Sequence, residues 1–186
     1  MGRANFASFL WMYYLEVMNH ASFDFDSPGT KKLVNRLRNP LLFKLYCLNK
    51  LPMAWFAGLA VEGISPEEIK IKLPYRWSTK NPFRSVYFAA QTAAAEMSTG
   101  LAVLLPVQHA GNISMLVTNT EANFMRKATS DLVFVCTEVP KAWKLVEKAI
   151  DTNAGQKALL RSEGIDKEGN VVSEFFFEWS VKVKSG

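Results

Sequence analysis

The clearest pattern in the chain is an alternation of apolar and polar residues near its end. Residues 171–184 place aromatic side chains such as Phe175 and Phe177 on one side and charged residues on the other. This is expected of a strand with one buried face. The segment 159–164 precedes it across a turn at 166–170, which predicts a hairpin. Further strands of an antiparallel sheet are predicted at 59–61, 69–73, 113–124 and 132–139.

A segment of a different kind interrupts these strands. Residues 85–104 are rich in alanine and apolar on nearly every side, which predicts a buried helix beginning at Ser85. The segment nevertheless carries Glu96, and a buried carboxylate is costly unless it is paired, hydrogen-bonded or protonated. The polar residues Ser85, Thr92, Glu96 and Thr99 form one stripe at helical spacing. The stripe either bonds to a neighbouring strand or subunit, or lines a reactive site with Glu96 as general base or nucleophile.

The first 56 residues predict a helical extension, placed before a sheet-containing domain at 57–186. Its helices are expected at 6–17, 30–38, 40–49 and 51–56, and one more helix is expected at 140–151. The third helix is predicted to carry four leucines on one side: Leu41, Leu42, Leu45 and Leu48. Because these helices are too aromatic to be solvated alone, we expect them to cover a sheet, a subunit interface or a ligand cavity.

Net charge and composition limit the classes of partner that are expected for this protein. The net charge is +5 and the pI is near 9.2, which favours anionic partners. A dense basic patch is missing from the sequence, so nucleic acid is not an expected partner. The small basic face at Lys31, Lys32, Arg36 and Arg38 is typical of a solvated helix. No apolar run is long enough to predict a transmembrane segment.

Cysteine and histidine are too sparse for several kinds of site. The two cysteines, Cys47 and Cys136, are far apart in apolar surroundings, which predicts reduced core thiols and a cytoplasmic protein. The two histidines, His20 and His109, fit neither a metal-ligand cluster nor a Ser-His-Asp arrangement. No metal and no cofactor are therefore expected.

Three stretches of the chain, at 81–100, 121–131 and 177–182, carry a resemblance to a known group. In this order and spacing they resemble hot-dog-fold proteins of the thioesterase-like superfamily, in a branch of largely uncharacterised bacterial members. The resemblance covers residues 57–184. It implies an α+β hot-dog fold, in which an antiparallel sheet wraps around the central helix and the N-terminal helices are an addition. It also implies a homodimer or tetramer, because a second copy usually completes the sheet and the site.

The same resemblance suggests roles for individual residues. Active members place an acidic residue on the central helix, where Glu96 stands in this chain. Asn81 would position the reactants, and coenzyme A would be present only as part of the substrate. The residues proposed to stabilise the oxyanion at the helix start are Ser85, Val86 and Tyr87. The remaining substrate-binding candidates are Arg84, Thr92, Thr99, Arg126 and Lys127, of which Arg126 and Lys127 would meet phosphates; Arg84 would meet a phosphate or pair with Glu96.

Three functions stay open on these grounds. The first is an acyl-CoA thioesterase that hydrolyses an acyl thioester through Glu96. The second is a non-catalytic module of the same fold that binds a fatty acyl or other apolar ligand. Its support is that Tyr87 and Ala89 stand where many active members have histidine and glycine. The third is a structural dimer or membrane-surface adaptor using residues 6–17, which the small cationic face of that segment disfavours.

Overall fold

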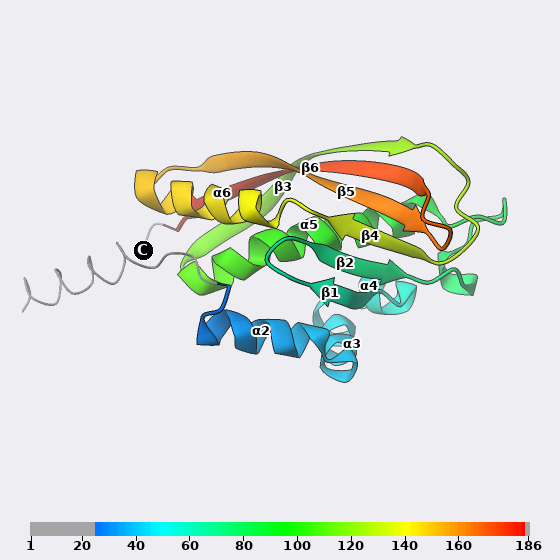
Figure 1. The fold of residues 1–186 in the computed structure, drawn as a ribbon, viewed down its shortest axis with the longest axis horizontal. Coiled ribbons are helices and arrows are strands. Elements are labelled where there is room, and N and C mark those ends of the chain that lie inside the picture. The colour runs from blue at the N-terminus through cyan, green and yellow to red at the C-terminus, as the bar shows by residue number, and fades with distance from the viewer. Residues whose placement is uncertain (1–24, 185–186) are drawn as a thin grey trace, which may run out of the picture.

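The computed structural model describes residues 25–184 and shows one sheet wrapped on one long helix (Figure 1). The helices are α2 (Pro28–Arg38), α3 (Pro40–Lys50), α4 (Pro52–Ala57), α5 (Phe88–Ala110) and α6 (Val139–Thr152), with a short 3₁₀ helix η1 at Trp77–Thr79. The strands are β1 (Ala60–Ile64), β2 (Ile69–Leu73), β3 (Ile113–Phe124), β4 (Leu132–Cys136), β5 (Gln156–Asp166) and β6 (Val171–Val183). The segment 6–17 lies outside the described residues.

The six strands form an antiparallel sheet in the order β1-β2-β4-β5-β6-β3. The predicted hot-dog arrangement is therefore confirmed, because α5 lies along the inner face of this sheet (Figure 1). Along β6 the alternation of the sequence becomes an alternation of burial, with Phe175, Phe177 and Trp179 inside. They belong to the same hydrophobic core as small, fully buried side chains of α5, such as Ala95 and Ala102. Small side chains on the helix allow strand and helix to approach.

The start of the central helix differs from the prediction. The helix begins at Phe88 rather than Ser85, and Tyr87 is its N-cap residue. The cause is a tight loop in which the side-chain oxygen of Asn81 accepts hydrogen bonds from Phe83 N–H and from the N–H and hydroxyl of Ser85. Arg84 turns the loop with φ of 57°, in the left-handed region. A short β-bridge between Lys80 and Val86 closes it.

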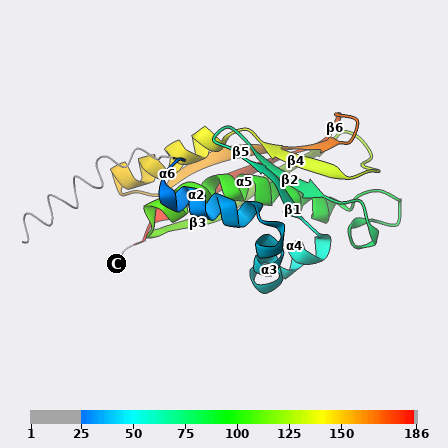
Figure 2. The same cartoon turned by 60° about the horizontal axis from the view of Figure 1, so that its bottom comes forward.

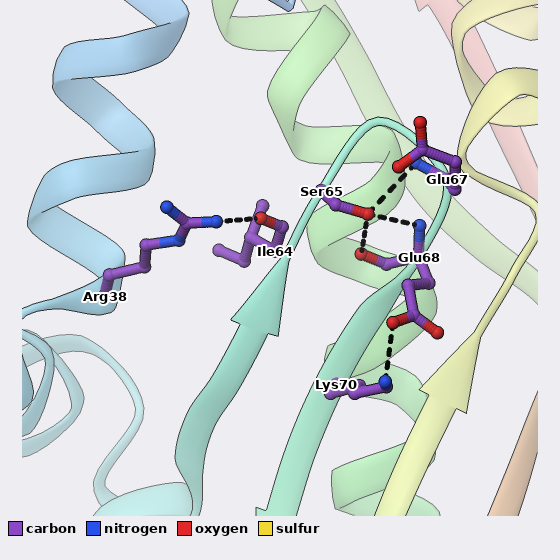
Figure 3. Close-up of polar contacts among 6 residues, drawn as sticks. All are labelled: Arg38, Ile64, Ser65, Glu67, Glu68 and Lys70. Atoms are coloured by element: carbon purple, nitrogen blue, oxygen red, sulfur yellow. Dashed lines mark hydrogen bonds and ion pairs between the residues drawn. The ribbon is translucent and has the colours of Figure 1, made fainter.

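The helix α2 is fastened to the sheet by its last turn (Figure 3). The Arg38 guanidinium donates a hydrogen bond to the carbonyl oxygen of Ile64, at the end of β1. The turn that follows is closed by Ser65, whose hydroxyl accepts hydrogen bonds from the N–H groups of Glu67 and Glu68 at 3.2 and 3.1 Å. One residue of the predicted basic face is thus a structural anchor.

The side of α3 that carries its leucines faces outward, although an apolar side was expected to cover another part of the protein. Of its residues only Phe43 and Cys47 are buried. The leucines on its outer side are exposed, and Leu41 is 67% exposed. The expectation that these helices cover something is met at the end of α3 and by α4, which border a cavity. The division of the chain at residues 56 and 57 stays a prediction.

Candidate functional site

The cavity that contains Glu96 has a volume of about 640 Å³ and lies between α5, the edge of the sheet and the α3–α4 junction. Its walls are mainly apolar. The lining residues are Lys50, Leu51, Pro52, Met53 and Ala54 from the helical junction; Phe88, Ala89, Thr92, Ala93, Glu96 and Met97 from α5; and Val117, Thr120 and Phe177 from the strands β3 and β6.

Glu96 is the acidic residue in this lining. Among the described residues its carboxylate has neither a hydrogen-bond partner nor an ion-pair partner, in contrast to the ion-paired carboxylates of the surface. Burial in apolar surroundings raises the pKa of the Glu96 carboxyl. A pairing of Arg84 with Glu96 is not seen within the protomer, since Arg84 is held in the loop before the helix.

Gly100, one helical turn beyond Glu96, makes room for that carboxylate. A Cβ atom at Gly100 would lie 3.2 Å from Glu96 Oε1 and 3.3 Å from the indole ring of Trp179. Trp179 cannot easily move away, because its indole N–H donates a 3.1 Å hydrogen bond to the hydroxyl of Thr99. The glycine therefore allows the carboxylate and the indole to approach the same turn of helix.

The first residues of α5, Phe88 and Ala89, border the same cavity and carry unused hydrogen-bond donors. The N–H groups of Phe88 and Ala89 have no acceptor among the described residues, and no side chain caps the helix. Free N–H groups in the first turn of a helix stabilise negative charge. The lining of the cavity therefore includes an unpaired carboxyl group and the first two residues of a helix whose N–H groups are free.

The residues predicted to form the oxyanion site do not have this property. The N–H of Ser85 donates to Asn81, that of Val86 to the carbonyl of Ala128, and that of Tyr87 to the carbonyl of Thr79. All three donors are used because these residues belong to the loop and not to the helix. The available donors lie one to two residues further on, which the later start of α5 explains.

A second hollow of about 410 Å³ lies on the other side of Phe88. It gathers six of the predicted site residues, which are Asn81, Ser85, Val86, Tyr87, Arg126 and Lys127. The side-chain oxygen of Asn81 is occupied by its own loop, while its amide N–H₂ group has no partner among the described residues. Within one protomer the structure therefore separates Asn81 and the two cations from Glu96.

The two predicted threonines differ in role. Thr92 lines the cavity, although its hydroxyl donates a 3.0 Å hydrogen bond to the carbonyl of Phe88. Thr99 is fully buried and accepts the indole hydrogen bond of Trp179, so it does not reach a ligand in the cavity. Thr92 and Glu96 are four residues apart, but Thr99 follows Glu96 by only three. The prediction that Thr99 belongs to the substrate-binding stripe overlooked this difference.

Few of the residues that line the cavity could be identified from the sequence. Val117, Thr120 and Phe177 lie on strands that were predicted, but their side of the sheet was not connected to Glu96. The spacing of four residues between Glu96 and Gly100 is a sequence signal that could have identified Gly100. Within residues 25–184 no group of three or more His, Cys, Asp or Glu side chains is placed to hold a metal ion. None of the helices there has the length and apolarity needed to cross a membrane.

Solved structures with the same fold are numerous. A protein of unknown function from Pseudomonas aeruginosa, described as a probable thioesterase, matches 80% of this chain and 99% of its own, with 18% identity and a TM-score of 0.66. A protein of unknown function from Chlorobaculum tepidum matches 81% and 99%, with 13% identity and a TM-score of 0.66. A thioesterase from Haemophilus influenzae matches 77% and 90%, with 15% identity and a TM-score of 0.58. At these identities the likeness establishes the fold.

Sequence comparison adds the family. No curated protein matches the chain. A family model described as Domain of unknown function (DUF4442) matches residues 40–181, which include α3, α4, the sheet and the central helix. The chain therefore belongs to the DUF4442 family and has the hot-dog fold.

Proposed function

We propose that the protein is a thioesterase that hydrolyses an acyl thioester, with acyl-CoA as the substrate class. The observation that supports this proposal best is the unpaired carboxyl of Glu96 in an apolar cavity whose lining also includes Phe88 and Ala89, the first residues of α5, whose N–H groups are free among the described residues. A carboxyl group with a raised pKa suits a general base, and helix N–H groups suit a developing oxyanion.

The reaction follows from these groups. The Glu96 carboxylate takes a proton from a water molecule, whose oxygen adds to the thioester carbon. The carbonyl oxygen becomes an oxyanion, stabilised by the N–H groups of Phe88 and Ala89. When the tetrahedral intermediate collapses, the C–S bond breaks and the protonated Glu96 returns its proton to the leaving thiolate. Direct attack of Glu96 on the thioester carbon, followed by hydrolysis of the anhydride, is the nucleophilic form of the same reaction.

The spacing of these groups favours a site shared by two copies. Ala89 and Glu96 are separated by seven residues of helix, which is about 10 Å along the axis at ~1.5 Å per residue. One thioester group cannot contact both at hydrogen-bond distance. In the described residues β3 has one neighbouring strand, β6, so its other edge is available for pairing. We therefore propose a homodimer or tetramer in which Glu96 of one copy faces the helix start of another.

Other candidate residues take roles consistent with this assembly. Arg126 and Lys127, with the free amide of Asn81, would receive the polar coenzyme A portion of the substrate, and Arg84 beside them would add a further cation. The acyl chain would lie against Met53, Val117 and Phe177. We propose a cytoplasmic protein, since Cys47 and Cys136 are both buried and unpaired.

The second candidate is a binding module that holds an acyl ligand without hydrolysing it. It is favoured by Tyr87 and Ala89, which stand where the resemblance expects histidine and glycine, and by the mainly apolar walls of the cavity. Both candidates use the same cavity. They differ in whether Glu96 acts on a bound thioester.

The experiment offers a panel of acyl-CoA thioesters of increasing chain length to the pure protein and follows release of free thiol. We expect turnover in the wild-type protein and a loss of about a hundredfold or more in the Glu96→Gln variant, which keeps the shape and removes the base. The matched control is Ser98→Ala on the same helix, which should retain turnover. Binding of acyl-CoA without thiol release would favour the module, and full turnover in folded Glu96→Gln would remove Glu96 from the mechanism.

A further inference from the structure

The short helices before the sheet expose large apolar side chains and bury small ones. In α4 the buried residues are Ala54 and Ala57, while Trp55 and Phe56 face outward. A soluble surface rarely exposes such a group of large apolar side chains in one place unless the surface binds something. We define the α3–α4 surface by six exposed residues: Leu41, Leu45, Leu48, Met53, Trp55 and Phe56.

The charge of this region is equally one-sided. From residue 27 to residue 61 the chain contains six basic residues and no acidic residue. Lys31 is paired with Asp26 and Arg38 with the carbonyl of Ile64. The other four, which are Lys32, Arg36, Lys44 and Lys50, have no carboxylate partner among the described residues. An excess of six positive charges over 35 residues exceeds the net charge of +5 of the whole chain.

The shape of the region suits contact with a broad surface. Figure 2 shows α3 and α4 projecting from the body of the domain, away from the sheet. Beside them a hollow of about 730 Å³ is bordered by Lys44 and Arg76 and by the aromatic rings of Trp55 and Trp77. Trp77 is 84% exposed. Cations next to tryptophan and leucine are the combination found at the boundary between lipid headgroups and acyl chains.

We propose that the α3–α4 surface docks on an anionic lipid bilayer, with its leucine and aromatic side chains inserted among the acyl chains and the neighbouring cations, such as Lys44 and Arg76, among the headgroups. A second copy of the chain is a poorer occupant, because two such surfaces would bring their unpaired positive charges together. Nucleic acid is a poorer one too, because it offers no apolar phase for Leu41 or Met53.

The position of the surface adds a consequence that rests on the proposed function. Residues 50–54, at the junction of α3 and α4, form one wall of the cavity that holds Glu96. Docking of the neighbouring residues would bring the mouth of this cavity to the lipid phase, where long acyl chains are concentrated. The bilayer would then deliver or receive the apolar portion of the substrate.

The test measures binding of the full chain to vesicles by flotation, with phosphatidylcholine alone and with phosphatidylglycerol added. We expect binding to the anionic vesicles that is at least tenfold stronger than to the neutral ones. The Leu41→Gln/Leu45→Gln variant changes two exposed residues and should bind at least tenfold more weakly. Lys44→Gln should bind about fivefold more weakly, since one lysine near an anionic bilayer contributes about 1 kcal/mol.

Matched controls place the same changes elsewhere. Leu116→Gln/Leu159→Gln alters two exposed leucines of the sheet, and Lys148→Gln alters an exposed lysine of α6. Both should bind within twofold of wild type. The proposal is overturned if anionic vesicles do not bind the protein, or if the controls lose as much binding as the α3–α4 variants. It is also overturned if Leu41→Gln/Leu45→Gln halves the particle mass in light scattering without changing vesicle binding, which would assign the surface to a second copy.

Vesicle binding does not depend on turnover. If the wild-type protein does not bind anionic vesicles but hydrolyses soluble short-chain acyl-CoA, the docking surface is refuted and the proposed function stands. Binding to anionic vesicles without hydrolysis of acyl-CoA would refute the proposed function and leave the docking surface standing. The two failures are therefore distinguishable in one set of preparations.

Discussion

The polar residues on two sides of the central helix α5 differ in whether they have hydrogen-bond partners. On the side facing β5 and β6, Gln91, Ser98 and Thr99 are buried and each has a partner on the sheet. Gln91 accepts a 2.8 Å hydrogen bond from Ser173, Ser98 shares one of 2.7 Å with Ser162, and Thr99 accepts one from Trp179. On the side facing the cavity, Glu96 has none among the described residues.

The difference teaches how polar residues in an apolar helix divide between stability and chemistry. A buried donor or acceptor that is satisfied fixes the position of helix against strand, and removing its partner is costly. A carboxyl group that is desolvated and unsatisfied adds nothing to that fixation. Retaining one is a cost to the folded state, which makes Glu96 the candidate for a reactive role.

The largest effect that would sharpen the comparison is expected at Phe88. Proline is favoured at the first position of a helix, and the extended backbone of Tyr87, with ψ of 135°, is compatible with a following proline. Phe88→Pro therefore removes one free N–H group from the start of α5 with little change of fold. We expect a loss of about a hundredfold in kcat with an acyl-CoA substrate, the usual cost of one oxyanion donor.

Phe88→Ala is the matched control for that variant, because it removes the same ring and retains the N–H group. Its kcat should fall much less than that of Phe88→Pro. Equal losses in the two variants would show that the ring and not the N–H group matters, and the helix start would leave the proposed mechanism.

A smaller effect, on stability alone, is expected on the other side of the helix. Thr99→Val keeps the side-chain shape and leaves the indole N–H of Trp179 without its acceptor. We expect the free energy of unfolding in urea to fall by about 1–3 kcal/mol. Turnover per folded molecule should be unchanged. A selective loss of turnover would return Thr99 to the substrate-binding residues.

The smallest effect concerns pH and stability. Burial raises the pKa of Glu96 in the folded state above its value in the unfolded chain, so the folded state binds the proton more tightly. The contribution of Glu96 is fully favourable below the unfolded pKa and is lost as pH rises through the folded pKa. Glu96→Gln should therefore be more stable than wild type at about pH 8 and lose that advantage near pH 4, around the ordinary glutamate pKa. Melting curves across this range measure the difference, and a variant less stable than wild type at high pH would indicate a structural role.

Much of the fold could be predicted because its strands and helices carry strong local patterns. The alternation of β6 and the alanine-rich surface of α5 indicate burial without knowledge of any partner. The start of α5 could not be predicted from local spacing. Asn81 closes the preceding loop with its side chain, and Ser85, a good N-cap residue, is used there instead.

In the candidate site, Glu96 could be predicted from the sequence, whereas the cavity around it could not. Glu96 stands out because a carboxylate is costly in an apolar helix. The contributions of Met53, Val117 and Phe177 depend on how α4, β3 and β6 meet in space, and no short-range pattern reports that. The outward direction of the leucines in α3 was missed for the same reason, since an amphipathic pattern does not say whether its apolar side faces the core or another partner.

The pairing of β3 with β6 has a consequence for how the protein is made. These strands join residues 113–124 to residues 173–183, so the cavity wall that includes Val117 and Phe177 closes a long loop of chain. Contacts so distant in sequence form slowly compared with local helices and hairpins. During synthesis the apolar surface of α5 is complete long before β6 exists to cover it. Nascent chains that stop short of β6 should therefore be bound by chaperones, and the site should appear only when the last strand is in place.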